Sequence, residues 1–495
     1  MKIVRFKQFV VAGLAGIVAV GGFAPWNIFP LPLISLALLF WLWEQAEGSR
    51  TSFWLGFSFG LGFFGAGVGW LYVALHEFGN MDVWLALLAM FLFASFIAMF
   101  PALAGLIQSK LKNAAWIKLS VLMPALWVMV ELLRGYLFTG FPWLTMGYSQ
   151  VPNSPLAGFA PIVGVYGVSL VIAISAGLIV LILKERLRLI GKVSATILIL
   201  FWLSGAGLHL VKWTTPEGDT VKISLLQGNI NEEEKFEETH LNETMQLYQR
   251  MAVQSDARLI VFPETALPIL RNEIPKNYIS ALKEYLKQHN ADVLIGSFEK
   301  EKGRYYNSMY SEGVSPSQNY RKNHLVPFGE FIPMRWMLGW FINNVLNIPM
   351  SDLSSGGEHQ ALLNLAGQRI AMNICYEDVF GEEIIRALPE ATLLLNTSND
   401  AWYGHSSAAI QHNQISQMRA LESGRMMLRA TNTGVTSVID RDGQILDMLP
   451  QHTEGVLTAN VQGYTGSTPY VRWGNAPVLG MIGLMLGVAR RLRRR

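Results

Sequence analysis

Three short segments of this 495-residue chain each place a reactive side chain beside an apolar run. Glu264 follows the run Leu259–Phe262, Lys322 lies shortly before an apolar stretch, and Cys375 closes the run Ile370–Ile374. A free thiol has a pKa of ~8.5 and is only a few per cent thiolate at neutral pH. A nearby carboxylate can accept the thiol proton, and an ammonium can stabilise the oxyanion of a tetrahedral intermediate. Together the three residues predict nucleophilic acyl chemistry on Cys375.

Each of these residues also has an ordinary interpretation when taken alone. Glu264 fits a solvated strand end, Lys322 an exposed surface, and Cys375 a small buried apolar residue. Because Cys375 is the only cysteine, an intramolecular disulfide and a cysteine-based zinc cluster are excluded. A Cys–His–Asn arrangement with His324 or His405 is possible on paper, but neither lies in a sequence typical of cysteine proteases. No His, Asp and Glu residues have metal-ligand spacing, so we expect no metal and no cofactor.

The composition indicates that these residues belong to a membrane protein. Hydrophobic residues make up 51% of the chain and charged residues only 15%, against about 25% in an average soluble domain. Apolar runs near or above the ~20 residues that cross a bilayer as a helix recur along the chain. They predict eight spans, two in the proline-broken run Gln8 to Trp43 and one each in Thr51 to Leu75, Val83 to Gln108, Leu119 to Phe138, Leu156 to Leu183, Val193 to Val211 and Trp473 to Ala489.

The basic residues predict how these spans are oriented. Lys and Arg occur in alternate loops, as the positive-inside rule requires of cytoplasmic loops. They lie before the first span, at Arg50, at Lys110 to Lys118, at Lys184 to Lys192 and at Arg490 to Arg495. Both termini are therefore predicted to be cytoplasmic. We expect residues 1–213 to form a seven-helix bundle, 214–470 an extracytoplasmic domain, and 471–495 a final helix with a basic tail.

The segment 214–470 has a more soluble composition and alternating secondary-structure patterns, which predict an α/β layered domain. We expect helices over Asn242–Gln254, Asn277–His289 and Ala408–Met427. The apolar runs predict strands over Val221–Leu226, Leu259–Phe262, Val293–Ser297, Ile370–Ile374, Leu393–Asn396 and Val435–Ile439.

Four ordered motifs in this segment resemble the carbon–nitrogen hydrolase (nitrilase) superfamily. They are Pro263-Glu264-Thr265-Ala266, His324-Leu325-Val326-Pro327-Phe328-Gly329-Glu330, Ile374-Cys375-Tyr376-Glu377 and Arg429-Ala430-Thr431-Asn432-Thr433-Gly434. The whole chain resembles the membrane branch of that superfamily, the apolipoprotein N-acyltransferase family. Two segments of the membrane part share this resemblance, Glu131-Leu132-Leu133-Arg134-Gly135 and Phe141-Pro142-Trp143-Leu144.

The resemblance implies a four-layer α-β-β-α domain attached to a multi-pass helical bundle. It implies that Glu264 is the general base, Lys322 the oxyanion stabiliser and Cys375 the acyl carrier. Residues that match supporting or substrate-binding positions of the family are Asn307, Glu330, Tyr376 and Glu377. At one further position the family has a tryptophan, and this chain has Phe236, which keeps an aromatic ring but lacks the indole N–H.

The reaction implied by the resemblance is a ping-pong transfer in a bacterial cytoplasmic (inner) membrane. Cys375 would take the sn-1 acyl chain of a phospholipid as a thioester, on the periplasmic side. The acceptor would be the α-amino group of a diacylglyceryl-cysteine at the N-terminus of an apolipoprotein, and no nucleic acid is expected as a partner. One alternative is a membrane-tethered amidase or nitrilase that passes the acyl group to water. Another alternative is a transporter with an outer domain. The spans of this chain lack the paired, broken and charged segments that mark transport sites.

Three other patterns lead to narrower expectations. Glu131 and Arg134 share a helix face, so they either pair with each other or serve the substrate. The segment Met334–Met350 has aromatic residues at helical spacing and is either core or an interfacial lid. The lid candidates are Trp336, Trp340 and Phe341. A polar helix face with ion pairs is expected from His412, Arg419, Glu422 and Arg425.

Overall fold

The computed structural model describes residues 2–186, 188–235, 238–333 and 352–492, and these residues form two compact units. The first unit contains Met1–Tyr72, Asp82–Lys212 and Arg472–Arg495. The second contains Trp213–Val471 and also the short segment Val73–Met81. In the second unit the ring of Phe78 lies 6.2 Å from the ring of Trp402, so this short segment packs on the α/β domain.

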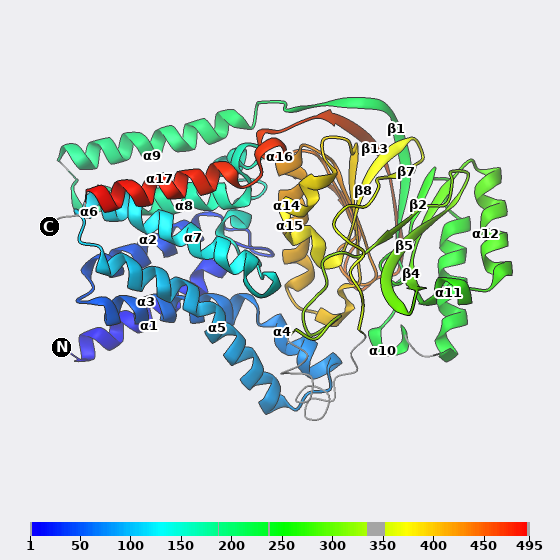
Figure 1. Ribbon diagram of the computed structural model, residues 1–495, viewed down its shortest axis with the longest axis horizontal. Coiled ribbons are helices and arrows are strands. Elements are labelled where there is room, and N and C mark those ends of the chain that lie inside the picture. Colours follow the sequence, from blue (N-terminus) through cyan, green and yellow to red (C-terminus); the bar gives the residue numbers. More distant parts are fainter. Residues whose placement is uncertain (1, 187, 236–237, 334–351, 493–495) are drawn as a thin grey trace. The chain divides into compact units, whose positions relative to one another are not determined.

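The first unit is a bundle of helices (Figure 1). Its longest members are α5 (Val83–Lys110) and α8 (Ala160–Lys184). The others are α1 (Lys2–Val20), α2 (Pro30–Gln45), α3 (Ser49–Gly67), α4 (Trp70–Val73), α6 (Ala115–Ile117), α7 (Met123–Tyr136), α9 (Leu189–Leu208) and α17 (Ala476–Arg491).

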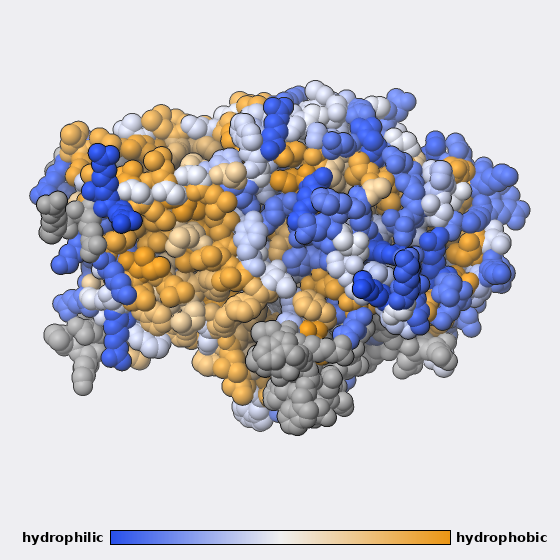
Figure 2. Space-filling view, in the orientation of Figure 1, coloured by the Kyte–Doolittle hydropathy of each residue, from blue (hydrophilic) through white to orange (hydrophobic). Residues whose placement is uncertain are grey.

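Four helical segments in the described residues are long and apolar enough to cross a membrane. They are Val83–Lys110, Ala115–Thr139, Pro155–Lys184 and Leu189–Leu208, and a bent pair, Ser49–Gly67 with Trp70–Phe78, makes a fifth if it is one span. The visible face of this unit is mostly hydrophobic, as expected of helices that contact lipid tails (Figure 2). The chain therefore has a helical region with four to five apolar helices long enough to span a membrane, and the full count of eight spans stays a prediction.

Glycine lets the helices of the bundle approach each other closely. A Cβ atom on Gly62 of α3 would lie 2.1 Å from the carbonyl oxygen of Gly13 on α1. Only hydrogen fits there, as is typical where membrane helices pack through small residues.

Glu131 and Arg134 on α7 both bind an irregular segment that follows the helix. Arg134 donates to the carbonyl oxygens of Phe141 and Trp143, the second at 2.6 Å. Glu131 accepts from the backbone N–H of Met146 at 2.9 Å and from the indole of Trp127 at 3.2 Å. Non-helical backbone inside a membrane bundle must be satisfied by protein groups because water is scarce there. The two charges therefore hold this segment in place, and the pairing of one with the other stays a prediction.

The second unit contains two β-sheets. The seven-stranded sheet has the order β13-β1-β2-β4-β5-β6, with β3 paired to β4. Its strands are β1 (Thr214–Gln227), β2 (Leu259–Val261), β3 (Leu267–Leu270), β4 (Asp292–Glu301), β5 (Arg304–Gly313), β6 (Asn319–Arg321) and β13 (Gly455–Gly466). The six-stranded sheet has the order β12-β11-β10-β9-β8-β7. It consists of β7 (Leu363–Leu365), β8 (Gln368–Ile374), β9 (Leu393–Ser398), β10 (Met427–Thr431), β11 (Ser437–Ile439) and β12 (Ile445–Met448).

Helices cover the outer face of each sheet, so the layers run helix, sheet, sheet, helix (Figure 1). The short α10 (Glu232–Lys235) precedes α11 (Glu238–Val253), which with α12 (Lys276–Gln288) lies on the seven-stranded sheet. Against the six-stranded sheet pack α14 (Gly381–Ile384), α15 (Ala408–Ser423) and the start of α16 (Pro469–Trp473).

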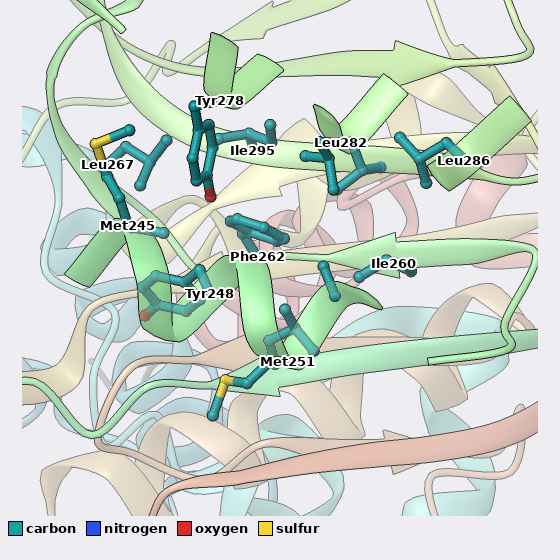
Figure 3. Close-up of a cluster of buried hydrophobic side chains, with 14 of the residues drawn as sticks. Met245, Tyr248, Met251, Ile260, Phe262, Leu267, Tyr278, Leu282, Leu286 and Ile295 are labelled. Atoms are coloured by element: carbon teal, nitrogen blue, oxygen red, sulfur yellow. The ribbon is translucent and has the colours of Figure 1, made fainter. Parts of the chain in front are cut away.

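Alternation along the strands explains why both faces of each sheet are apolar. Ile260 of β2 belongs to the same buried cluster as Tyr248 of α11 and Leu282 of α12 (Figure 3). Its neighbours Leu259 and Val261 are equally buried but point to the opposite face, since successive strand residues alternate. The two sheets therefore pack face to face and fix the positions of the strand ends.

The structure corrects one predicted helix. The pattern predicts a helix to Met427, but α15 ends at Ser423, and β10 begins at Met427. Gly424 adopts φ +64°, the left-handed conformation that commonly terminates a helix. The residues after it belong to a buried strand, and apolar periodicity alone does not separate these two cases.

The membrane unit leads to a first prediction. Glu131→Leu leaves the N–H groups of Met146 and Trp127 without their carboxylate acceptor, which costs about 1–3 kcal/mol per lost partner. We expect a clearly lower melting temperature of the detergent-solubilised protein. The control is Ser175→Ala on α8, because the buried Ser175 hydroxyl has no hydrogen-bond partner among the described residues. Equal melting temperatures for the two variants would contradict the structural role of Glu131.

Candidate active site

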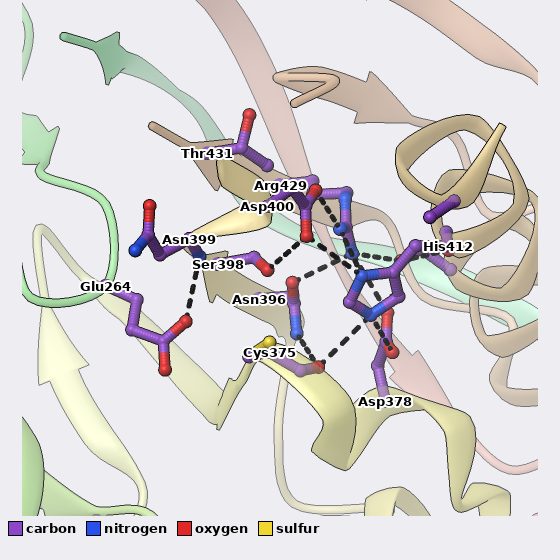
Figure 4. Close-up of polar contacts among 12 residues, drawn as sticks. Glu264, Cys375, Asp378, Asn396, Ser398, Asn399, Asp400, His412, Arg429 and Thr431 are labelled. Atoms are coloured by element: carbon purple, nitrogen blue, oxygen red, sulfur yellow. Dashed lines mark hydrogen bonds and ion pairs between the residues drawn. The ribbon is translucent and has the colours of Figure 1, made fainter. Parts of the chain in front are cut away.

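Cys375 lies at a sharp turn between strand β8 and the 3₁₀ helix Cys375–Val379. Its φ of +53° falls in the left-handed region, which is unfavourable for a residue with a Cβ atom and is often found at functional sites. Two side chains hold its carbonyl oxygen: Asn396 donates at 3.0 Å, and Nε2 of His412 lies 3.3 Å away (Figure 4). The turn is therefore fixed from the neighbouring strand and from α15.

Glu264 lies in a second tight turn just after β2. Thr265, the next residue, also has a positive φ, at +46°. The turn rests on Gly296 of β4, where a Cβ atom would come within 2.3 Å of the carbonyl oxygen of Pro263. One oxygen of the Glu264 carboxylate accepts from the Asn307 amide at 2.6 Å. The other accepts from the backbone N–H of Asn399 at 2.8 Å (Figure 4).

Lys322 follows β6 and is 1% exposed. Its ammonium lies 2.9 Å from a carboxylate oxygen of Glu330 and 3.3 Å from Glu264. Burial alone would lower the pKa of Lys322, but the two carboxylates outweigh it and raise the pKa well above its ordinary value. The lysine is thus a fixed positive charge with little access to water.

The thiol of Cys375 is in an environment that keeps it protonated. Burial raises its pKa, and the negative charge of Glu264 raises it further, while Lys322 acts in the opposite direction. Before the reaction, the sulfur of Cys375 is therefore a protonated thiol and not a thiolate. The thiol proton must leave as the sulfur attacks. The Glu264 carboxylate, whose negative charge acts on the thiol, is a group that can accept it.

The supporting residues expected from the sequence lie in the same place. Glu330 accepts from the backbone N–H of Val326 at 2.8 Å while it pairs with Lys322. Glu377 binds its own turn, because its carboxylate accepts from the N–H of Ile374 at 2.6 Å. It also accepts from the Tyr320 hydroxyl and from the N–H groups of Asn323 and His324.

Tyr376 directly follows Cys375, and its ring lies edge-on to Phe380 at 5.3 Å. The segment with the lid candidates Trp336, Trp340 and Phe341 lies outside the described residues, as does Phe236.

Two residues that sequence reasoning missed complete the site. Asn399 donates to Glu264 through its backbone and to Glu232 through its amide, at 2.7 Å. Lys235 is a second buried lysine, 2.7 Å from the Thr265 hydroxyl and 3.4 Å from the Glu264 carbonyl oxygen. Burial lowers the pKa of Lys235, while the carboxylates of Glu232 and Glu264 oppose that effect. In the sequence Lys235 follows three glutamates, which is typical of a solvated helix, so nothing local marks it as buried.

Two facing sheets flanked by helices, with a glutamate, a lysine and a cysteine brought together at their strand ends, define a carbon–nitrogen hydrolase type of domain. The family model for carbon–nitrogen hydrolases matches residues 222–470. A second model, for the N-terminal domain of apolipoprotein N-acyltransferases, matches residues 15–178. The chain belongs to the apolipoprotein N-acyltransferase family and is an acyltransferase.

Relatives match over nearly the whole chain. An apolipoprotein N-acyltransferase of Nitrosomonas europaea is 50% identical, covering 97% of this chain and 96% of the relative. That of Methylococcus capsulatus is 40% identical over 99% of this chain and 97% of the relative. That of Ralstonia nicotianae is 42% identical over 97% of this chain and 93% of the relative. The match includes both the helical unit and the α/β unit.

Glu377 leads to a prediction about pH. Burial raises its pKa from 4.5 to about 7, against the effect of the backbone amides that bind it. Between these values the folded protein binds a proton that the unfolded chain does not. The contribution of Glu377 to stability is therefore complete below pH 4.5 and is lost as the pH rises to about 7, by up to about 3 kcal/mol.

The measurement is the melting temperature of the wild type and of Glu377→Gln, from pH 5 to pH 8. Glutamine does not titrate, so the difference between the two proteins should change across this range. The wild type should lose more stability than the variant as the pH rises. Parallel curves would mean that Glu377 has no raised pKa.

Proposed function

We propose that this enzyme moves an acyl chain from a phospholipid to the N-terminal α-amino group of a diacylglyceryl-cysteine apolipoprotein, through a thioester on Cys375. The observation that supports this is the placement of the buried Lys322 ammonium between Glu264 and Glu330. The charges of Lys322 and Glu264 also act on the pKa of the Cys375 thiol, in opposite directions. The names of the relatives identify an apolipoprotein as their substrate, which supports the same acceptor here.

In the first half-reaction, Glu264 accepts the thiol proton as the sulfur of Cys375 attacks the sn-1 ester carbonyl. Lys322 stabilises the oxyanion of the tetrahedral intermediate, a contribution worth roughly 3 kcal/mol for one such donor. The ester C–O bond then breaks, and the proton held by Glu264 passes to the leaving alkoxide. The products are a lysophospholipid and the Cys375 thioester.

In the second half-reaction, the α-amino group of the apolipoprotein attacks the thioester carbonyl. Glu264 takes a proton from the attacking amine and passes it to the departing sulfur as the C–S bond breaks, which regenerates both the thiol and the carboxylate. An amide is more stable than a thioester, so this step is favourable. The competing function, hydrolysis by a membrane-tethered amidase or nitrilase, would pass the same acyl group to water and is not favoured by the family to which the chain belongs.

The site is predicted to depend on all three residues in the first half-reaction. We expect Cys375→Ala to abolish thioester formation and N-acylation, and Glu264→Gln and Lys322→Met to reduce thioester formation by at least 100-fold, the effect of about 3 kcal/mol of barrier. Intact-protein mass spectrometry after mixing with a phospholipid that carries palmitate at sn-1 and oleate at sn-2 would identify the acyl group on Cys375. A Cys375→Ala protein that still N-acylates a lipopeptide would overturn the mechanism.

We further propose eight membrane crossings, with both termini in the cytoplasm and residues 214–470 on the periplasmic side of the inner membrane. The loops that contain Lys and Arg support this orientation. Both substrates are lipids, so a catalytic domain held at the membrane surface can receive them without extracting them from the bilayer.

A reporter that functions only in the cytoplasm tests this topology. Fused after Trp213, it should be inactive, because the following domain is outside. The control fusion after Lys112, in a loop that contains basic residues, should be active. Activity of the first fusion would reverse the proposed orientation.

A further inference from the structure

Behind Cys375 lies a cluster of charged residues that the proposed reaction does not use. Its centre is Arg429 of β10, which is fully buried. Around its guanidinium are Asp378, Asp400 and His412, each at most 1% exposed (Figure 4). Burying so many charges is costly unless each is closely paired, so their retention calls for an explanation.

The two terminal nitrogens of Arg429 orient the two side chains that hold the nucleophile. One donates to the Asn396 amide oxygen at 2.9 Å, and the other lies 2.7 Å from Nδ1 of His412. With Asn396 oriented in this way, its NH₂ group faces the Cys375 carbonyl oxygen. Nδ1 of His412 also lies 3.3 Å from Asp400, while Nε2 faces Asp378 at 2.8 Å and the same Cys375 carbonyl oxygen at 3.3 Å.

The same guanidinium binds both carboxylates of the cluster. Arg429 lies 3.2 Å from Asp378 and 3.0 Å from Asp400. Burial would raise the pKa values of these two aspartates, but Arg429 and His412 lower them below the ordinary range, so both are ionised.

Each carboxylate belongs to a segment that forms the active site. Asp378 lies in the 3₁₀ helix that begins at Cys375. Asp400 follows Asn399, whose backbone N–H holds Glu264. Arg429 therefore connects the turn that carries the nucleophile with the turn that binds the general base.

We propose that Arg429 is a positioning residue for the nucleophile. Its planar guanidinium sets the orientation of Asn396 and His412, which together hold the Cys375 carbonyl and keep Cys375 in its left-handed conformation. This inference rests on the proposed function, because it assigns Arg429 a role in forming the Cys375 thioester.

Arg429→Lys tests the role of the guanidinium. Lysine keeps the charge but lacks the rigid pair of donors that can hold two acceptors in fixed directions. We expect the rate of thioester formation to fall roughly 10- to 100-fold, with the KM for phospholipid unchanged, because a displaced reacting group costs up to about 10²-fold. The measurement is single-turnover acylation of Cys375, normalised to folded protein, with the palmitoyl-oleoyl phospholipid in detergent micelles.

Arg425→Lys is the matched control. Arg425 is equally buried and lies four positions earlier in the chain. Its guanidinium binds the backbone carbonyl oxygens of Ala391, Pro389 and Gly466, at 2.7 to 3.0 Å. The Arg425→Lys variant should lower the melting temperature as Arg429→Lys does, but it should leave the acylation rate within about 3-fold of the wild type. Equal loss of rate in both variants would reduce Arg429 to a general role in stability.

A double-mutant cycle tests whether Arg429 acts through His412. His412→Phe keeps a ring but removes both nitrogens, and should itself slow acylation. In the Arg429→Lys background it should slow acylation much less, because the orientation of His412 is already lost. Independent, multiplying effects would overturn the proposal, as would a wild-type rate for Arg429→Lys.

The remaining outcomes are also decisive. If Arg429→Lys does not fold, then Asn396→Ala and His412→Phe carry the test, since each removes one donor to the Cys375 carbonyl oxygen. Wild-type rates in both would overturn the proposal. If the wild type itself forms no thioester with phospholipid, the proposed function fails rather than the role of Arg429.

Discussion

The site depends on one buried positive charge above all, the ammonium of Lys322, which is shared by the carboxylates of Glu264 and Glu330. An isolated charge in such a dry place would be neutralised or would disrupt the fold, and breaking a buried pair costs roughly 3–5 kcal/mol. The carboxylates therefore stabilise the ammonium, and the ammonium in turn keeps Glu264 close to the thiol. Because Cys375 stays protonated at rest, the proposed mechanism needs a base in place to take the proton, the role proposed for Glu264.

The double-layered sheet explains how these groups come together. Parallel pairs β1–β2–β4 and β8–β9–β10 place several strand ends at neighbouring positions, and the apolar layers on both sides of each sheet hold them in register. Glu264 and Cys375 occupy the turns that follow β2 and β8, where Thr265 and Cys375 both take positive φ values, and Lys322 follows the antiparallel strand β6. Such strained backbone persists only when surrounding contacts determine it. The polar contacts of Asn396, Asn399 and the Arg429 cluster supply that constraint.

The helical unit obeys a different physical rule, because its solvent is lipid. The face seen in Figure 2 is mostly apolar, and Glu131 and Arg134 bind irregular backbone between α7 and α8 inside the bundle. A charged pair that resembles a functional motif in the sequence thus has a structural reason to be there. In the soluble unit the opposite occurs, since the ionic residues His412 and Arg425, expected on a polar helix face, are fully or almost fully buried.

The sequence by itself determined the reactive residue types and the class of each element. One cysteine after an apolar run, a glutamate after another and a lysine between them indicated the chemistry, and charge-free runs indicated a membrane protein, because both signals are local. Strand and helix patterns predicted α11, α12 and most of the central strands within a few residues. The tertiary structure alone decided that Asn399 holds Glu264, 135 residues away, that Lys235 is buried, and that Arg429 pairs with both Asp378 and Asp400. These contacts join residues that are distant in the chain, and neither periodicity nor composition records which strand ends will meet. They are set when the two sheets pack, since only then do the polar groups at the strand ends lose water and require partners.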